Sequence, residues 1–221
     1  MIQIAIDGPS GAGKSTIAKA VAQKMNFIYV DTGALYRAVG VAALNRNLDY
    51  HNETLIAPML QEIKVDLVYE DGVQKVLLNG EDVSREIRMP EASMAASGVS
   101  ALPCVRQFLL ETQREIASKN NVIMDGRDIG TVVLPGAQIK IFLTASAEKR
   151  AQRRFAELQE KGIDATYQEV LDDMVKRDYN DSHRAIAPLK PAEDAVFVDT
   201  SDLNLEQSIV AIEQTIRTAL Q

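Results

Sequence analysis

The sequence predicts an α/β fold, in which helices flank a mainly parallel β-sheet that carries a small antiparallel insertion. Near the N-terminus, two short apolar segments typical of buried strands alternate with two segments of helical periodicity. In the middle of the chain, two Asx-Gly pairs separate short alternating segments, as in an antiparallel meander. The last third of the chain returns to buried-type strands and amphipathic helices.

The first four elements form a strand–helix–strand–helix series. IQIAID (residues 2–7) is a short apolar run that stops at a glycine, as a buried parallel strand does. Apolar residues four apart, starting at Ile17, predict a helix over residues 14–25. FIYVD (residues 27–31) predicts a second strand, and a second helical pattern follows it. This order implies a parallel sheet with right-handed crossovers.

The middle of the chain breaks this rhythm. IKVDLVY (residues 63–69) alternates apolar and polar residues up to the turn signal Asp71-Gly72, and VQKVLL (residues 73–78) runs to Asn79-Gly80. A third extended piece is expected over residues 81–87. Antiparallel ribbon inside a parallel pattern indicates an insertion.

The remaining elements are predicted by periodicity and capping signals. Pro103 suits the first turn of a helix whose apolar stripe is expected at Phe108, Thr112 and Ile116, with Val105, Leu109 and Leu110 beside it. Thr166 and Glu169 form a capping-box start for a later helix. The other expected elements are strands over residues 121–125, 139–143 and 195–199, a helix over residues 146–162 that ends at Gly162, and a final helix whose apolar face holds Leu205, Ile209, Ile212, Ile216 and Leu220.

Composition limits the functions that the chain can have. The 221 residues are 46% hydrophobic and 25% charged, which are ordinary values for a globular protein. The net charge of −7 argues against nucleic acid and anionic membranes as partners. The single cysteine, Cys104, fits a reducing compartment. There is no leader pattern and no apolar run of roughly 18 residues, so we expect a cytoplasmic protein, with a monomer as the default.

GPSGAGKST is predicted to bind the triphosphate of a nucleotide. The segment satisfies the pattern G-x-x-x-x-G-K-[ST], in which the glycine-rich backbone surrounds a phosphate, Lys14 reaches the β and γ phosphates and the Ser15 hydroxyl ligates Mg²⁺. A glycine-rich turn that matches by chance is the alternative, but the predicted strand before it and helix after it favour the phosphate loop. The expected ATP-binding residues are Gly8, Pro9, Ser10, Gly11, Ala12, Gly13, Lys14, Ser15 and Thr16.

The absence of an Asn-Lys-x-Asp tetrapeptide argues against a GTPase, and the short chain leaves little room for an ATP-driven motor. A small-molecule kinase remains. A hydroxyl acceptor needs a base, whereas a phosphate acceptor needs positive charge.

Arginines supply that charge. Arg150, Arg153 and Arg154 share one side of a predicted helix, and Asp181 stands between two further arginines at spacings of four and three. Two more follow strand ends. For each of these residues taken singly, the alternative is that it lies on a solvent-exposed helix face and binds no ligand. Together, Arg37, Arg127, Arg150, Arg153, Arg154, Arg177 and Arg184 indicate a phosphate acceptor.

Four segments carry a resemblance to a known family. GPSGAGKST, DTGALYRA, DGRDIGTVV and KRDYNDSHRAIAPL, in this order, resemble the bacterial cytidylate kinases within the nucleoside monophosphate kinase family. The resemblance runs from the first strand to the last helix. It implies a P-loop NTPase-like fold with a five-stranded parallel sheet flanked by helices, a small antiparallel β insertion in the monophosphate-binding region and a helical lid.

The resemblance also implies a single kinase domain with three parts. The core covers residues of about 1–35, 103–146 and 186–221, the monophosphate-binding region about 36–102, and the lid with its following helix about 147–185. The implied reaction is direct in-line transfer of the γ-phosphoryl group of MgATP to CMP or dCMP.

The resemblance assigns site residues by matched position. The CMP-binding residues would be Thr32, Arg37, Ser97, Arg106, Arg127, Asp128, Arg177, Asp181 and Arg184. The catalytic residues would be Lys14, Arg127, Arg150, Arg153, Arg154, Arg177 and Arg184, and Mg²⁺ would be held by Ser15 and, through water, by Asp125. In cytosine recognition, Asp128 can accept from the N4 amine while Arg106 and Ser97 donate to N3 and O2.

Alternatives remain open for single residues and for the function of the whole chain. Thr32 could merely cap a helix, Ser97 could be a small packing residue, and Asp125 could be a turn former. For the whole chain, a kinase of another acceptor such as UMP, AMP or shikimate is the first rival. An ATPase or nucleotide switch without an acceptor is the second.

Overall fold

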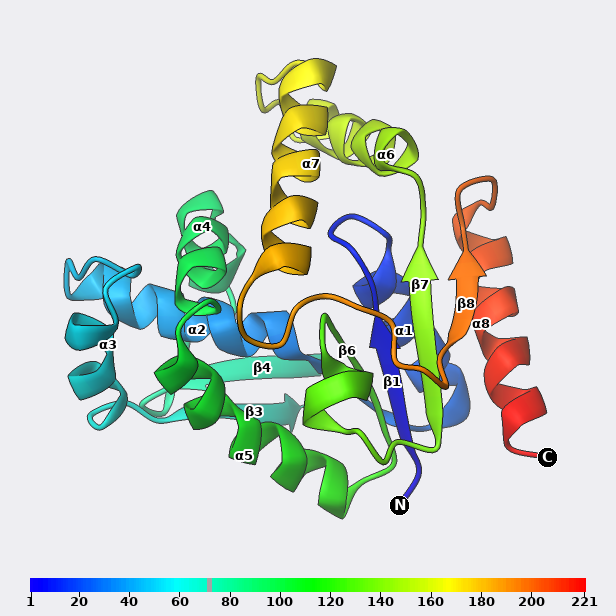
Figure 1. Ribbon diagram of the computed structural model, residues 1–221, viewed down its shortest axis with the longest axis horizontal. Coiled ribbons are helices and arrows are strands. Elements are labelled where there is room, and N and C mark those ends of the chain that lie inside the picture. The colour runs from blue at the N-terminus through cyan, green and yellow to red at the C-terminus, as the bar shows by residue number, and fades with distance from the viewer. Residues whose placement is uncertain (71–72) are drawn as a thin grey trace. The chain divides into compact units, whose positions relative to one another are not determined.

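The structure is a computed structural model that describes residues 1–70 and 73–221. The chain divides into two compact units (Figure 1). The first unit comprises Met1–Tyr29 and Asn120–Gln221, and the second comprises Val30–Lys119.

The main sheet is five-stranded and parallel, as the resemblance implies. Its strands lie in the order β2 (Ile28–Asp31), β6 (Val122–Gly126), β1 (Gln3–Asp7), β7 (Ile139–Thr144) and β8 (Val196–Asp199). Asp7 at the end of β1 stands opposite Gly126 on one side and Phe142 on the other. The loops that follow β1 and β6 therefore leave the sheet at the same edge, which is the edge where ligands of parallel α/β sheets bind.

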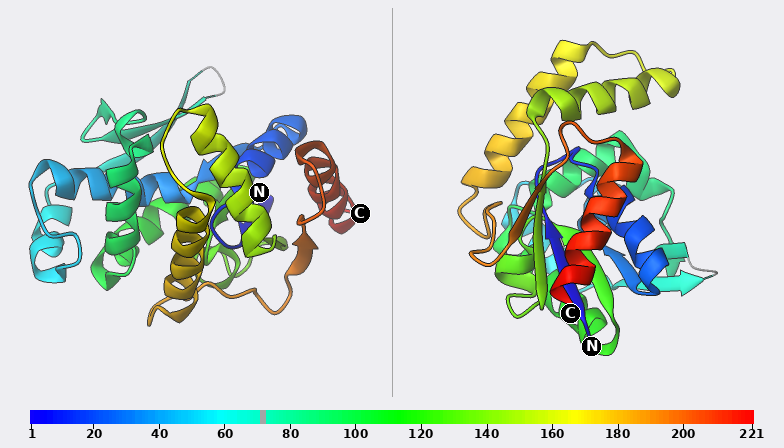
Figure 2. Two further views of the ribbon diagram at one scale, coloured as in Figure 1. Left: turned by 90° about the horizontal axis from the view of Figure 1, so that it is seen from above. Right: turned by 90° about the vertical axis from the view of Figure 1, so that its right-hand side faces the viewer.

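Two helices of the first unit cover one face of this sheet. α1 (Lys14–Met25) and α8 (Leu205–Ala219) form one core cluster with alternate residues of β1 and β7, including Ile4, Ile141 and Leu143. Figure 2 shows α8 running alongside the sheet. The predicted apolar face of α8 is buried at its centre, at Ile212 and Ile216. Leu205 and Leu220, at its two ends, are exposed, and Ile209 is half-buried.

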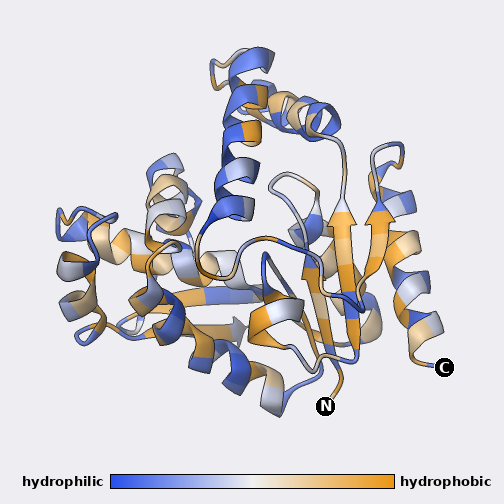
Figure 3. Cartoon of the chain, viewed as in Figure 1, coloured by the Kyte–Doolittle hydropathy of each residue, from blue (hydrophilic) through white to orange (hydrophobic). Residues whose placement is uncertain are grey.

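The region predicted as the lid with its following helix, residues 147–185, holds two helices, α6 (Ala147–Glu160) and α7 (Tyr167–His183). The capping signals are confirmed: Ser146 caps α6, Gly162 follows it at φ 66°, and Thr166 forms a capping box with Glu169. Both helices lie beyond the carboxyl ends of β1 and β7 (Figure 1). They are mostly hydrophilic, in contrast to the apolar strands (Figure 3), since only a small cluster around Ala151 and Met174 packs between them.

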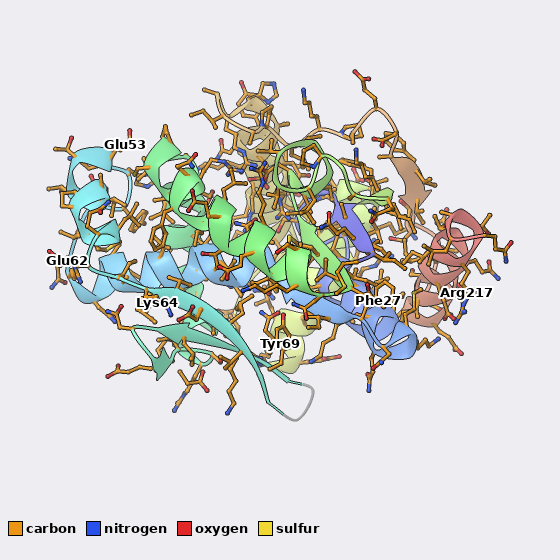
Figure 4. The ribbon with its side chains drawn as sticks, turned by 90° about the horizontal axis from the view of Figure 1, so that it is seen from below. Phe27, Glu53, Glu62, Lys64, Tyr69 and Arg217 are labelled. Atoms are coloured by element: carbon orange, nitrogen blue, oxygen red, sulfur yellow. The ribbon has the colours of Figure 1, made fainter. Side chains whose placement is uncertain are left out.

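The second unit is helical with one small sheet. α2 (Thr32–Asn45), α3 (Glu53–Leu60), α4 (Pro90–Val99) and α5 (Pro103–Lys119) share one apolar core with β3 (Val65–Glu70) and β4 (Val73–Leu78). The sheet is completed by β5 (Glu81–Asp82), and a 3₁₀ turn, η1 (Glu86–Arg88), follows it. Figure 4 shows Glu53 at the start of α3 and Glu62 just past its end, with Lys64 just before β3 and Tyr69 in that strand.

The predicted meander is confirmed with one correction. β3, β4 and β5 pair antiparallel, and Asn79 and Gly80 join Leu78 to Glu81 with φ values of 53° and 86°, as a tight hairpin turn requires. The turn predicted at Asp71-Gly72 lies outside the described residues. The third strand is shorter than expected, because the Asp82 side chain accepts a hydrogen bond from Ser84 N and turns the backbone out of the sheet.

The buried face of α5 also differs from the expected one. The predicted stripe at Phe108, Thr112 and Ile116 is only half-buried. The fully buried row is Val105, Leu109, Gln113 and Ala117. Because Gln113 is polar, this row does not read as continuously apolar in the sequence. The periodicity therefore favoured the adjacent row that starts at Phe108.

Among the described residues, no helix is both long enough and apolar enough to cross a bilayer.

Candidate active site

The phosphate loop is built as the sequence predicts, with β1 before it and α1 after it. Gly8 has φ 152°, and a Cβ there would lie 1.9 Å from the carbonyl oxygen of Leu143, so only glycine fits. Gly13 caps α1 in the left-handed conformation at φ 86°. The helix N-terminus and its amides thus stand where a phosphate can bind them.

Lys14 is buried inside this loop. Its ammonium donates to the carbonyl of Pro9 at 2.7 Å, so the side chain folds back over the loop. Burial, aided by the charge of Arg127, lowers the pKa of Lys14 to about 7. An anion in the loop would reverse both effects, because it would solvate and pair with the ammonium.

Ser15 and Asp125, which are predicted to hold Mg²⁺, lie in contact. The Ser15 hydroxyl donates to Asp125 Oδ2 at 2.9 Å, and the Tyr29 hydroxyl donates to Asp125 Oδ1 at 2.9 Å. Asp125 is buried and receives both bonds from other elements, which argues against a mere turn former. A hydroxyl and a carboxylate fit Mg²⁺, which usually takes one or two protein ligands and fills the rest with water and phosphate oxygens. No cluster of three or more acidic, His or Cys ligands occurs within residues 1–70 and 73–221.

The lid arginines take three different directions. Arg150 is buried and bonds the carbonyl of Ser10 in the phosphate loop at 2.8 Å and Asp178 at 2.6 Å. Arg153 donates to the carbonyl of Thr200 at 2.6 Å. Arg154 pairs with Glu157 at 3.0 Å on the surface. The expectation that one side of the helix presents three guanidinium groups together is therefore not met, because the long side chains diverge toward separate acceptors.

The lid packs directly on the phosphate loop. A Cβ placed on Gly11 would lie 2.9 Å from the Met174 Cε atom of α7 and 3.4 Å from the Arg150 Cβ atom of α6. Together with the Arg150–Ser10 bond, this contact brings α6 and α7 against the loop that is predicted to hold ATP. Among the lid arginines, Arg150 is the one that touches the loop in this structure.

The predicted acceptor residues of the first unit form two acid–arginine pairs. Arg127 Nε donates to Asp181 Oδ2 at 2.7 Å, and Arg184 Nη2 lies 3.4 Å from Asp128 Oδ1. Burial would raise the pKa of Asp181, but Arg127, Arg177 and Arg184 together hold it below its ordinary value.

Arg184 stands at the C-terminal cap of α7, beyond the last helical residue. The helix therefore does not continue through the whole predicted spacing, although Arg177 and Asp181 share it.

The second unit holds the other four predicted residues. The cap of α2 is Asp31, which accepts from Ala34 N at 3.0 Å and from Arg37 at 2.7 Å, so Thr32 is buried in the first turn without being the cap. Arg106 is buried on α5 and lies over the ring of Tyr36.

Ser97 is exposed on α4, which argues against a packing role. Its alternative as a small core residue therefore has no support in the burial pattern.

Three residues with clear structural roles were missed from the sequence. Tyr29 holds Asp125, Asp178 holds Arg150, and Asp7 binds two backbone amides after Asp128. Asp7 had a visible signal, since it is an acid that ends a buried strand just before the glycine loop. The other two depend on contacts that are distant along the chain.

Comparison with known proteins identifies the family. The family model described as cytidylate kinase matches residues 4–218. A cytidylate kinase from Caldicellulosiruptor bescii is 52% identical over 206 residues, covering 93% of this chain and 91% of the relative. One from Lactobacillus johnsonii is 49% identical over 217 residues, covering 98% and 94%.

Among solved structures, a protein from Eubacterium ventriosum has a TM-score of 0.50 at 14% identity, with 99% of each chain covered, which bears on the fold alone. Both the family model and the relatives span nearly the whole chain, from the first strand to the last helix. The chain belongs to the cytidylate kinase family.

Proposed function

We propose that this chain transfers the γ-phosphoryl group of ATP to CMP or dCMP and thereby forms CDP or dCDP. Membership of the cytidylate kinase family supports this reaction. The observation that carries the proposal is the pairing of β1 with β6, in which Asp7 stands opposite Gly126. The phosphate loop that follows β1 and the Arg127–Asp128 loop that follows β6 therefore start side by side.

The donor side uses the phosphate loop, from Gly8 to Thr16. Its amides and the Lys14 ammonium bind the phosphate chain of ATP. Ser15 would hold Mg²⁺ directly, and Asp125 would hold it through water. Bound there, Mg²⁺ neutralises phosphate charge. Tyr29 orients the Asp125 carboxylate through its 2.9 Å hydrogen bond.

The acceptor side in the first unit uses the acid–arginine pairs. Arg127, Arg177 and Arg184 bind and orient the phosphate of CMP, while Asp181 accepts from the ribose hydroxyls. Asp128 accepts from the N4 amine of cytosine. Uracil presents an oxygen at that position, so it would leave the Asp128 charge unpaired, and discrimination on the order of 10²-fold follows.

In the second unit, the proposed CMP-binding residues rest on the resemblance. They are Thr32, Arg37, Ser97 and Arg106. The cytoplasmic location, the monomeric state and the division into core, monophosphate-binding region and lid are proposed on the same basis.

The transfer is direct and in line, without a covalent enzyme intermediate. Both substrates carry phosphate, so the main task of the protein is to position them and to neutralise charge. Arg150, Arg153 and Arg154 are proposed to stabilise the transferred group. Each of them binds a protein acceptor in this structure, so each has to exchange that acceptor for phosphate when ATP binds.

A substrate panel tests this proposal. ADP formation is followed with ATP and Mg²⁺ in the presence of CMP, dCMP, UMP, AMP or shikimate, each at several concentrations. The proposal expects the highest kcat/KM with CMP or dCMP, and a higher value with another acceptor would contradict it. Omitting Mg²⁺ serves as the control for the metal site.

A further inference from the structure

Asp7 is a buried carboxylate for which the mechanism above has no role. It is the last residue of β1 and directly precedes the phosphate loop, with only 4% of its surface exposed. Its Oδ1 accepts from Ile129 N at 2.8 Å, and its Oδ2 accepts from Gly130 N at 2.7 Å. One side chain thus links the start of the phosphate loop to the turn that follows Asp128.

That turn, η2 (Ile129–Val133), is a single π-helical turn whose cap position is occupied by Asp128. Aspartate at a cap position normally accepts from the second or third amide of its own helix. The Asp128 side chain makes no such bond, and the second amide, that of Gly130, is bound to Asp7 together with the first, that of Ile129. The Asp128 carboxylate lies instead 3.4 Å from Arg184 Nη2.

A carboxylate suits position 7 because each oxygen accepts one N–H group. Asparagine offers a single acceptor oxygen and would turn its NH₂ group toward the second amide. The arrangement is costly: burial raises the pKa of Asp7 to about 6 although the two amide bonds lower it, and the nearby charge of Asp128 adds to the rise. A neutral residue at position 7 would remove that cost. It would also free an amide of the turn, to which the Asp128 side chain could then bond.

We propose that Asp7 is a positioning residue for base recognition: it takes over the cap of the Ile129–Val133 turn and so keeps the Asp128 carboxylate turned toward the acceptor. This inference rests on the proposed function, in which Asp128 accepts from the cytosine amine. Loss of Asp7 lets Asp128 rotate onto the amides of its own turn, which weakens CMP binding and discrimination against UMP more than it weakens ATP binding.

The test compares four variants with the wild type in steady-state kinetics with CMP and with UMP at saturating ATP, and in equilibrium binding of ATP. Asp7→Asn removes one amide acceptor, and Asp7→Ser keeps a shorter one. Asp128→Asn is the reference for loss of base recognition. Ile216→Val, which removes one methyl group from the buried face of α8, is the control for a general loss of packing.

We expect both Asp7 variants to raise KM for CMP and to lower the CMP-to-UMP ratio of kcat/KM by about tenfold or more. The dissociation constant of ATP should change by less than about threefold, and Ile216→Val should keep the wild-type ratio. A merely structural role would lower the amount of folded enzyme without changing the ratio.

The outcomes separate this inference from the proposed function. A wild type that does not phosphorylate CMP, or an Asp128→Asn variant that keeps full discrimination, overturns the proposed role of Asp128 and this inference with it. If Asp128→Asn loses discrimination while the Asp7 variants keep it, only the inference fails. It also fails if both Asp7 variants do not fold while Ile216→Val does, because Asp7 would then serve the fold.

Discussion

Single residues in the first unit show how the protein pairs its buried and half-buried charges. Arg127 is bound by Asp181, Arg150 by Asp178, and Arg184 lies beside Asp128. An uncompensated buried charge is strongly destabilising, so each of these arginines needs an acid beside it.

Arg127 is the residue whose loss should affect turnover most clearly. Its guanidinium is charged and bound at 2.7 Å to Asp181, next to the loop that ends β6. Losing one charge-assisted contact to the acceptor phosphate costs about 1.5–3 kcal/mol, or roughly ten- to a hundredfold in kcat/KM for Arg127→Ala. ATP binding should survive, as measured by calorimetry. Unchanged steady-state rates would refute the placement of Arg127.

Asp181 gives a pH dependence of stability. Its pKa is depressed in the folded state, so its ionisation stabilises the fold above the unfolded pKa of about 4, and this contribution is lost as the pH falls through the folded pKa. The difference in unfolding free energy between the wild type and Asp181→Asn should therefore be largest at neutral pH and shrink below pH about 4. Urea denaturation at a series of pH values measures it, and a constant difference would contradict the pairing.

The buried side chain of Gln113 should lower the free energy of unfolding. It is buried on α5, and neither atom of its amide has a hydrogen-bond partner among the described residues. Gln113→Met keeps the volume and removes the buried polar atoms, so the free energy of unfolding should rise by about 1–3 kcal/mol. Gln107→Met, at an exposed position of the same helix, is the matched control. If Gln113→Met leaves the urea midpoint unchanged or lowers it, a partner for the amide must exist.

Sequence motifs predicted which residues lie at the candidate site, but they did not predict the hydrogen-bond partners of those residues. Lys14 and Ser15 were predicted because the phosphate loop fixes both type and spacing, and the Ser15–Asp125 contact agrees with the predicted metal site. Tyr29 and Asp178 were missed because their contacts, to Asp125 and Arg150, join segments that are distant in sequence. A pattern of residue types carries no information about such pairs.

Helices and strands are the scale at which the sequence was most informative. α1 was predicted with its observed bounds, Lys14–Met25, because a glycine cap and a regular apolar row coincide there. The errors lie where a polar residue stands in a buried row, as in α5, or where an Asx turn ends a strand, as after Asp82. α3 and α4 were not predicted, since their segments are short.

The contact of α6 with α7 gives a prediction at this scale. Asp178 of α7 binds Arg150 of α6 at 2.6 Å, and Arg150 binds the phosphate loop. Asp178→Ala should cost about 1.5–3 kcal/mol and loosen the lid, because the buried Arg150 loses its counter-charge. Hydrogen exchange of the α6 and α7 amides should rise in this variant and not in Asp173→Ala, an exposed position of α7. Equal protection in both would show that the pair does not hold the lid.

For the whole molecule, the fold class was predictable because strand–helix alternation, two Asx-Gly turns and a phosphate loop all agree with one architecture. The number of strands in the parallel sheet came from the resemblance. Their order came only from the structure, since periodicity does not reveal which strands are neighbours. The net charge of −7 does not exclude local positive charge, since Arg127 directly follows β6 and Arg150 bonds the loop that follows β1.

The central claim is that the phosphoryl group passes from ATP to a cytidine monophosphate. The most direct measurement follows the label of [γ-³²P]ATP in a rapid-quench experiment with Mg²⁺, in the presence and absence of CMP. The account predicts that the label moves into CDP only when CMP is present, and that none stays on the protein. Label released as inorganic phosphate at the same rate without CMP would contradict it.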